Sequence, residues 1–258
     1  MNVHPTAVIH PQARLASTVT IGPYCVVGEQ VELGDDCELM SHVVIEGQTQ
    51  IGPRNRFFPF VSIGQPPQDL KYRGEPTRVE IGSDNIFREF ATVHRGTAGG
   101  GGLTRIGSHN LLMAYVHIAH DCTLGDHIIM ANAATLAGHV EIQDNASVGA
   151  FCGIHQFCRV GAYSFLGGYS VVTRDLLPYS KTSAPRPLGV LGANQVGLER
   201  RGFSKEEIEE LQAAFRLLCR AKLNTTQALE AIEREVGDSE EKRVLLEFIR
   251  NSERGVIK

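Results

Sequence analysis

The sequence lacks several features that mark particular classes of protein. No run of eighteen apolar residues occurs, so we expect no membrane-spanning segment. The formal net charge is −4 and charged residues make up 21% of the chain, which argues against nucleic acid as the main partner. The opening residues, MNVHPTAVIHPQARLAS, contain no basic segment followed by an apolar core, so no secretory signal peptide is expected.

The six cysteines are informative because of a pattern that they do not form. No C-x-x-C pair occurs, and such a pair is the usual signature of a zinc or redox site. Free thiols are typical of a reducing compartment. We therefore expect reduced cysteines and a cytoplasmic location.

A repeat of six residues is the main feature that the sequence does contain. From Ile9 to Ile63 every sixth residue is large and apolar, and the step of six resumes over 81–93 and, after a second break, over 106–172. Two positions before each of these lies a small or aliphatic residue, and five of the six cysteines occupy this slot, which predicts a packing role for them. Glycine often follows the large residue, where we expect it to allow a corner.

This period matches neither the 3.6 residues of a helix nor the 2 of a strand. It is typical of a hexapeptide parallel β-helix, in which each hexad is one short strand and three hexads make one coil. We therefore predict a mainly β fold, with about eight coils stacked at the spacing of paired strands. This β-helix should occupy residues 1–175.

Three segments depart from the repeat. Residues 64–78 and 94–104 interrupt the repeat, and the step of six resumes after each, so we expect each to be a loop ejected from a corner. Residues 176–192 are proline-rich and predict a linker. The remainder, 193–258, predicts a small helical domain, because Ser204 and Glu207 form a capping box before an apolar stripe of helical spacing.

Half of the ten histidines are predicted to share one edge of the prism. Counting three hexads to a coil brings together His94, His117, His120, His139 and His155, beside the 64–78 loop. His120 precedes Asp121, so the pair could act as a general base with a carboxylate that holds the imidazole tautomer.

Two other interpretations of this edge stay open. Three imidazoles could hold zinc, as in the γ-class carbonic anhydrases, although the His-x-x-x-x-His spacing of that family is absent. A non-catalytic β-helix could instead bind a surface through a flat face. Such proteins tend to carry serine or threonine ladders, which the sequence lacks.

Several motifs resemble those of the UDP-N-acetylglucosamine O-acyltransferase family. They are QDLKYRGEPTRVEIG at 68–82, HRGT at 94–97, GSHNLLMAYVHIAHDC at 107–122, ATLAGHV at 134–140, HQFCRVGA at 155–162 and GLERRGF at 197–203. The resemblance implies a left-handed β-helix and a homotrimer with each active site between two prisms. It also implies transfer of a 3-hydroxyacyl chain from acyl carrier protein to the 3-hydroxyl of UDP-N-acetylglucosamine, the first step of lipid A biosynthesis, without metal or other cofactor.

The resemblance further implies roles for individual residues. His120 matches the general base, Asp121 its orienting partner, and the Gly138 amide the position that stabilises the oxyanion. Gly168 and Tyr169 match positions that set acyl length. Substrate-binding positions are matched by Asp69, Lys71, His94, His117, His139, His155, Gln156, Asn194, Arg200 and Arg201.

Two features keep related activities open. Val196 stands where some relatives have an acidic residue near uracil, so a sugar with a 3-amino group is an alternative acceptor. The runner-up activity is the lipid A N-acyltransferase that acts on a monoacylated UDP-glucosamine. That enzyme typically has an extra domain before its β-helix, whereas the hexads here begin by Ile9.

Overall fold

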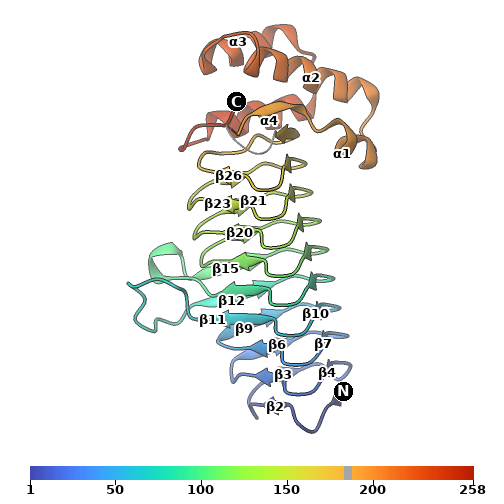
Figure 1. Ribbon diagram of the computed structural model, residues 1–258, viewed down its shortest axis with the longest axis vertical. Coiled ribbons are helices and arrows are strands. Elements are labelled where there is room, and N and C mark those ends of the chain that lie inside the picture. The colour runs from blue at the N-terminus through green and yellow to red at the C-terminus, as the bar shows by residue number, and fades with distance from the viewer. Residues whose placement is uncertain (183–187) are drawn as a thin grey trace.

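The protein is a triangular prism of short parallel strands, capped at one end by helices (Figure 1). The computed structural model describes residues 1–182 and 188–258. Three sheets form the sides of the prism, and the chain visits them in turn, so that strands paired within a sheet are one coil apart. The expected left-handed parallel β-helix is confirmed.

The strands are short, and up to β26 each sheet takes every third one, while β27 and β28 both join sheet A. Sheet A contains β1 Asn2–Val3, β4 Thr20–Ile21, β7 Glu38–Leu39, β10 Arg56–Phe57, β13 Ile86–Phe87, β16 Leu111–Leu112, β19 Ile129–Met130, β22 Ser147–Val148, β25 Phe165–Leu166, β27 Ser180–Thr182 and β28 Val190–Ala193. Sheet B contains β2 Val8–Ile9, β5 Val26–Val27, β8 Val44–Ile45, β11 Ser62–Gln65, β14 Thr92–His94, β17 His117–Ile118, β20 Thr135–Leu136, β23 Gly153–Ile154 and β26 Val171–Val172. Sheet C contains β3 Arg14–Leu15, β6 Val31–Leu33, β9 Gln48–Ile51, β12 Arg78–Ile81, β15 Leu103–Ile106, β18 Thr123–Leu124, β21 Glu141–Ile142 and β24 Arg159–Val160.

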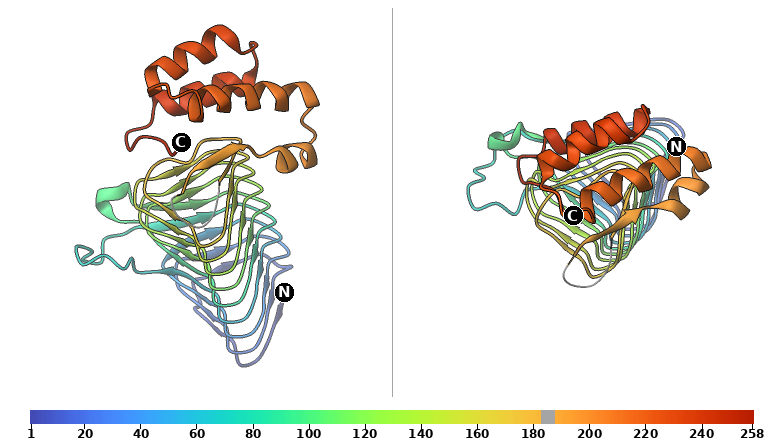
Figure 2. Two further views of the ribbon diagram at one scale, coloured as in Figure 1. Left: turned by 45° about the horizontal axis from the view of Figure 1, so that its top comes forward. Right: turned by 90° about the horizontal axis from the view of Figure 1, so that it is seen from above.

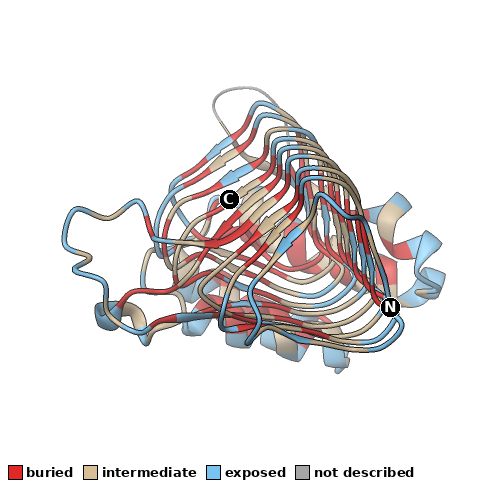
Figure 3. Ribbon diagram, turned by 90° about the horizontal axis from the view of Figure 1, so that it is seen from below, coloured by how far each residue is buried: buried red, intermediate tan, exposed pale blue. Residues whose placement is uncertain are grey.

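The interior of the prism is filled by the large residue of each hexad. From Ile21 to Val172 every one of these residues is buried, whereas Ile9 and Leu15 in the first coil are only partly covered. Figure 3 shows this buried interior from below. The five cysteines of the repeat are buried and free, as expected for a packing role. The phase of the hexad is thus the direct cause of the fold.

Many corners have left-handed backbone, but glycine is not what permits it. The positive φ falls on the third residue after the interior one: Tyr24, with φ of 58°, follows Ile21. The glycine after the interior residue, such as Gly22 or Gly52, therefore does not supply the left-handed backbone of the corner. That glycine permits close stacking of coils, because a Cβ on Gly52 would lie 2.8 Å from the carbonyl oxygen of Gly82 in the next coil.

The two predicted loops leave the prism at the same corner, between sheets B and C. The first connects β11 to β12, and the second connects β14 to β15 one coil later and contains the short helix η1, Ala98–Gly100. Both protrude together from one side of the prism (Figure 1). Arg95 holds them together, because its side chain donates to the hydroxyl of Tyr72 (3.0 Å) and to the carbonyl of Gly64 (2.8 Å).

Beyond β26 the chain closes the end of the column. Leu176 and Leu177 are buried, and β27 and β28 extend sheet A, so the segment predicted as a linker also contributes two strands; its residues 183–187 lie outside the described part. Helices α1 Gln195–Arg200, α2 Lys205–Cys219, α3 Thr225–Glu235 and α4 Glu240–Arg250 follow and pack around a second apolar core (Figure 2). The predicted capping box of Ser204 and Glu207 is present. None of the described helices has the length and apolar character needed to cross a bilayer.

The column should be sensitive to its interior and tolerant at its corners. Phe87 is fully buried and stacks on Phe57 in the coil below, with ring centroids 4.9 Å apart. Phe87→Ala should lower the free energy of unfolding by about 3–5 kcal/mol, because the cavity cannot be filled by rigidly stacked coils. Phe90→Ala, three residues along at an exposed corner, should cost far less. Equal shifts of the urea midpoint for the two variants would contradict the interior-column view.

Candidate active site

Four histidines meet at the corner between sheets B and C. His94 ends β14 and His117 begins β17, and their rings contact edge to face with centroids 5.0 Å apart. One turn further, the rings of His120 and His139 make a similar contact at 5.2 Å. Successive coils stack in register at this corner, since His117 pairs with Thr92 below and Thr135 above. The shared edge predicted from the hexad count is present.

His120 and Asp121 form a hydrogen-bonded pair. His120 Nδ1 lies 2.8 Å from Asp121 Oδ2. A carboxylate can only accept, so Nδ1 is the protonated nitrogen and Nε2 keeps a free lone pair. Asp121 occupies the corner position with φ of 60°, and its side chain is 1% exposed. The pair thus has the arrangement of a base held in one tautomer.

Gly138, in the coil above, lies directly against the His120 ring. A Cβ at Gly138 would be 2.5 Å from Cε1 and 2.8 Å from Nε2 of His120, so only glycine allows this approach. Among the described residues its amide N–H has no hydrogen-bond partner. A free N–H beside a basic nitrogen is suited to an oxygen atom that gains negative charge as the base accepts a proton.

The imidazoles around this pair are held neutral. Burial, followed by the nearby His117 and His120, lowers the pKa of His94 to about 4. Burial and then His120 lower the pKa of His117. Burial also lowers the pKa of His139, against the opposing effect of the Asp121 carboxylate. At neutral pH these three rings therefore offer uncharged donors and acceptors.

The first loop brings Asp69 toward the same corner. Burial lowers the pKa of His139, and the negative charge of Asp69 is close enough to oppose that shift slightly. Asp69 Oδ1 accepts from the backbone N–H of Lys71, whose side chain is exposed. Asp69 therefore stands near the histidine cluster, Lys71 lies beside it in the same loop, and the substrate contacts of both stay a prediction.

His155 and Gln156 lie at the same corner, above His139. Both are exposed, and His155 Nδ1 lies 3.1 Å from the carbonyl oxygen of Gln156. The next residue, Phe157, stacks on the His139 ring with centroids 4.4 Å apart. Sequence reasoning did not select Phe157, although it occupies the same position of the hexad as Asp121 and His139 and could have been found from that spacing.

Arg200 and Arg201 lie on a different side of the prism. With Asn194, Val196 and Lys181 they line a hollow over sheet A, the side opposite the corner between sheets B and C. Asn194 is buried, and its amide nitrogen donates to the carbonyl oxygen of Tyr163 (3.0 Å). Lys181 on β27 is a further cation in this hollow that the sequence did not single out.

Gly168 and Tyr169 lie at a third place, the corner between sheets A and B. Tyr169 is 67% exposed and stacks on Phe151 of the coil below at 5.1 Å. Within one chain, therefore, the histidines, the arginines and these two residues occupy separate sides of the prism.

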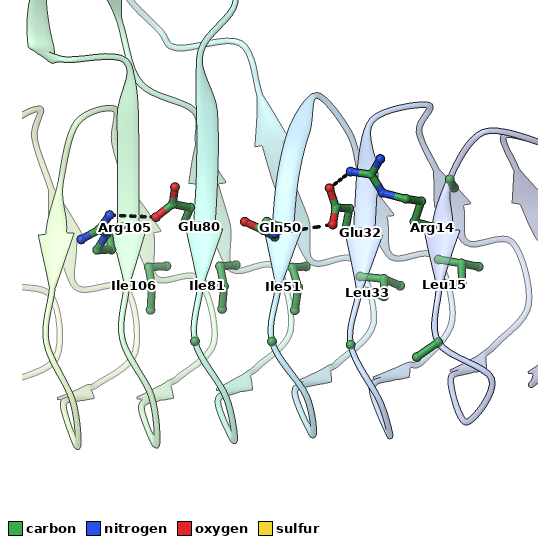
Figure 4. A pocket seen from close by; sticks show the side chains of 15 residues that line it. Arg14, Leu15, Glu32, Leu33, Gln50, Ile51, Glu80, Ile81, Arg105 and Ile106 are labelled. Atoms are coloured by element: carbon green, nitrogen blue, oxygen red, sulfur yellow. Dashed lines mark hydrogen bonds and ion pairs between the residues drawn. The ribbon is translucent and has the colours of Figure 1, made fainter.

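One further hollow, on the outward face of sheet C, contains none of the expected site residues (Figure 4). Its charged groups pair with one another: Arg14 with Glu32, and Arg105 with Glu80 at 2.9 Å. The charged groups on this face are therefore already neutralised by one another.

A metal would have to compete with the pair described above. Ligand atoms of His120, Asp121 and His139 lie within 4.8 Å of one another. His120 Nδ1 and Asp121 Oδ2 already bond to each other, and Asp121 also accepts two hydrogen bonds from Thr97. The potential ligand atoms are thus arranged to hydrogen-bond with one another rather than to coordinate one cation.

Lowering the pH should destabilise the protein through His94. With a pKa of 6.5 when unfolded and about 4 when folded, this imidazole binds a proton only in the unfolded chain between those values. The stabilising contribution of neutral His94 is present above pH 6.5 and is lost as the pH falls toward 4, a change of about 3 kcal/mol. In denaturant titrations from pH 7 to 4, His94→Gln should lose about that much less stability than the wild type.

The exposed His10 supplies the control. His10→Gln should keep the pH dependence of the wild type. The same pH dependence in the wild type and His94→Gln would refute the role of His94.

Comparisons with known proteins agree along the whole chain. Residues 175–257 match the family described as UDP-N-acetylglucosamine O-acyltransferase, domain 2. Two relatives called acyl-[acyl-carrier-protein]–UDP-N-acetylglucosamine O-acyltransferase are those of Thermodesulfovibrio yellowstonii, 48% identical over 98% of both chains, and Syntrophobacter fumaroxidans, 46% identical over 100% of both.

Solved structures give the same result. The LpxA structure from Acinetobacter baumannii is 46% identical and matches with a TM-score of 0.95 over 99% of both chains. The UDP-N-acetylglucosamine acyltransferase of Bacteroides fragilis is 42% identical, with a TM-score of 0.97 over 99% of this chain and 100% of that one. With these identities over nearly complete lengths, the chain belongs to the UDP-N-acetylglucosamine O-acyltransferase family.

Proposed function

We propose that this protein transfers a 3-hydroxyacyl chain from acyl carrier protein to the glucosamine 3-hydroxyl of UDP-N-acetylglucosamine, the first step of lipid A biosynthesis. The observation that carries the proposal is the His120–Asp121 pair, with the His120 ring packed against the backbone of Gly138. The names of the family relatives give the acyl carrier protein as the acyl donor and UDP-N-acetylglucosamine as the molecule acylated on oxygen. The free cysteines fit a cytoplasmic location, where we expect the enzyme to work.

The geometry supports a direct transfer without a covalent enzyme intermediate. His120 Nε2 takes the proton from the sugar hydroxyl as its oxygen attacks the thioester carbonyl carbon. The carbonyl oxygen becomes an oxyanion and accepts from the Gly138 N–H. As the carbon–sulfur bond breaks, the imidazolium returns its proton to the departing thiolate. The Asp121 carboxylate stabilises the imidazolium between these two steps.

The proposed substrate-binding residues belong to one site only if chains associate. The histidine corner and the arginine hollow lie on opposite sides of one prism. Sheet A, which bears the hollow, also exposes apolar residues, Ile129 and Phe165 among them, and Leu111 stands in the same outward row. We propose that this side packs against a neighbouring chain in a homotrimer, so that each site combines histidines of one chain with Arg200 and Arg201 of the next.

His120→Ala should abolish most of the activity. Loss of the general base should lower the rate of acyl transfer by about 10²–10⁴-fold without unfolding the column. His109→Ala, at the corner between sheets C and A, is the control and should keep full activity. Mass spectrometry should follow hydroxyacyl carrier proteins of several lengths with UDP-N-acetylglucosamine, its 3-amino analogue and monoacylated UDP-glucosamine.

The same assay separates the alternatives. Full activity of His120→Ala would refute the base assignment. Loss of activity on chelation, restored by Zn²⁺, would favour the zinc interpretation. Acylation of the monoacylated nucleotide alone would favour the N-acyltransferase.

Mixing two inactive variants should restore activity if sites are shared between chains. In a co-expressed mixture of His120→Ala with an Arg200→Ala/Arg201→Ala double variant, about a quarter of the sites would receive both intact sets. Activity near that fraction of the wild type is expected. A mixture no more active than its components would show that each chain builds its own site.

A further inference from the structure

The loop 94–104 folds back onto the catalytic carboxylate. The backbone N–H of Thr97 donates to Asp121 Oδ1 at 2.9 Å, and its hydroxyl donates to Asp121 Oδ2 at 2.6 Å. Thr97 is buried, with 8% of its surface exposed. Thr97 ends the HRGT motif, but the sequence did not indicate a role for it. The two donors of Thr97 and the His120 Nδ1–H together supply hydrogen bonds to both oxygens of the Asp121 carboxylate.

The glycines of this loop are shaped to the same carboxylate. A Cβ on Gly100 would lie 2.1 Å from Asp121 Cγ and 2.2 Å from Oδ2, and one on Gly96 would lie 2.8 Å from Oδ1. The backbone at these two positions therefore rests on the carboxylate and separates it from solvent. Gly99, by contrast, has open space where a Cβ would project. Of the loop glycines without positive φ, Gly96 and Gly100 therefore leave no room for a side chain, whereas Gly99 does.

The loop also fixes the backbone of Asp121 from the other side. The Thr104 hydroxyl accepts from the Asp121 N–H at 2.8 Å, and Thr104 lies at the end of the same loop. Asp121 itself has left-handed backbone, which is uncommon for a residue other than glycine. Side chain and backbone are therefore both held by residues of the 94–104 loop.

We infer that Thr97 is a positioning residue for acyl transfer. It orients the Asp121 carboxylate so that Oδ2 receives the His120 Nδ1–H, which leaves Nε2 aimed at the acceptor hydroxyl. Thr97 acts through Asp121 and touches neither substrate. Hydrogen bonds to a charged group are strong, and a carboxylate that has lost one of them is free to rotate away from His120. The inference rests on the proposed function.

The test is a double-mutant cycle read as separate kcat and KM values. Thr97→Val removes the hydroxyl donor at similar size and should lower kcat roughly 10- to 100-fold with KM little changed. Thr97→Ser keeps the hydroxyl and should retain most of the activity. In an Asp121→Ala background the same Thr97→Val change should have no further effect, because the group it positions is gone. Equal losses in both backgrounds would overturn the inference.

A pair of glycine variants tests the loop backbone. Gly100→Ala should lower kcat, since its methyl group would displace the carboxylate, whereas Gly99→Ala should leave kcat unchanged. Equal kcat values for the two variants would contradict the inference that the loop backbone holds the Asp121 carboxylate in place.

A spectroscopic measurement keeps this inference separate from the proposed function. In the wild type, the His120 Nδ1 proton bonded to Asp121 should give a downfield NMR signal, identified by its absence in His120→Ala. Thr97→Val should shift or broaden that signal, and Thr97→Ser should preserve it. An unchanged signal in Thr97→Val would overturn the inference. A wild type inactive on all acceptors would instead refute the proposed function, and the NMR comparison would still decide the role of Thr97.

Discussion

The stacking of identical hexad positions between successive coils is the constraint on which the rest of the molecule depends. Parallel pairing in register puts Val93, Ile118, Leu136 and Ile154 one above another in the interior. Every residue beside them then has a fixed direction, since neighbouring side chains on a strand point to opposite faces. Because the column is rigid, side chains from different coils meet at fixed separations, and no additional helix or sheet is needed to position them.

The site uses this rigidity at one corner and adds the 94–104 loop at the same place. His120 and Gly138 belong to neighbouring coils, so their approach follows from the spacing of paired strands. Asp121 lies on the column too, but its surroundings come from the 94–104 loop. A carboxylate that a corner would leave in water is thereby buried and directed at one nitrogen. Column and loop together make the histidine a suitable base.

The column could be predicted from the sequence because its rule is local. Once Ile118 points inward, His117 must point outward, and His120 and Asp121 must reach the corner, where the structure places them. The burial of Asp121 could not be predicted in this way, because Thr97 lies 24 positions earlier in a segment without periodicity. The position of Arg200 could not be predicted either. Helix α1 is only six residues long and shows no amphipathic repeat, so the residue pattern did not indicate that it lies over sheet A.

The division of every coil among three sheets restricts how such a protein can change in length. Each strand of the column pairs only with strands of the coil above and the coil below. The gain or loss of a complete coil therefore leaves every other residue on its own side of the triangle. A change of a single hexad would rotate all later residues by one side and carry His120 away from the loops that precede it. During evolution such a protein can therefore gain complete coils, and each remaining side chain still lies on the same side of the prism.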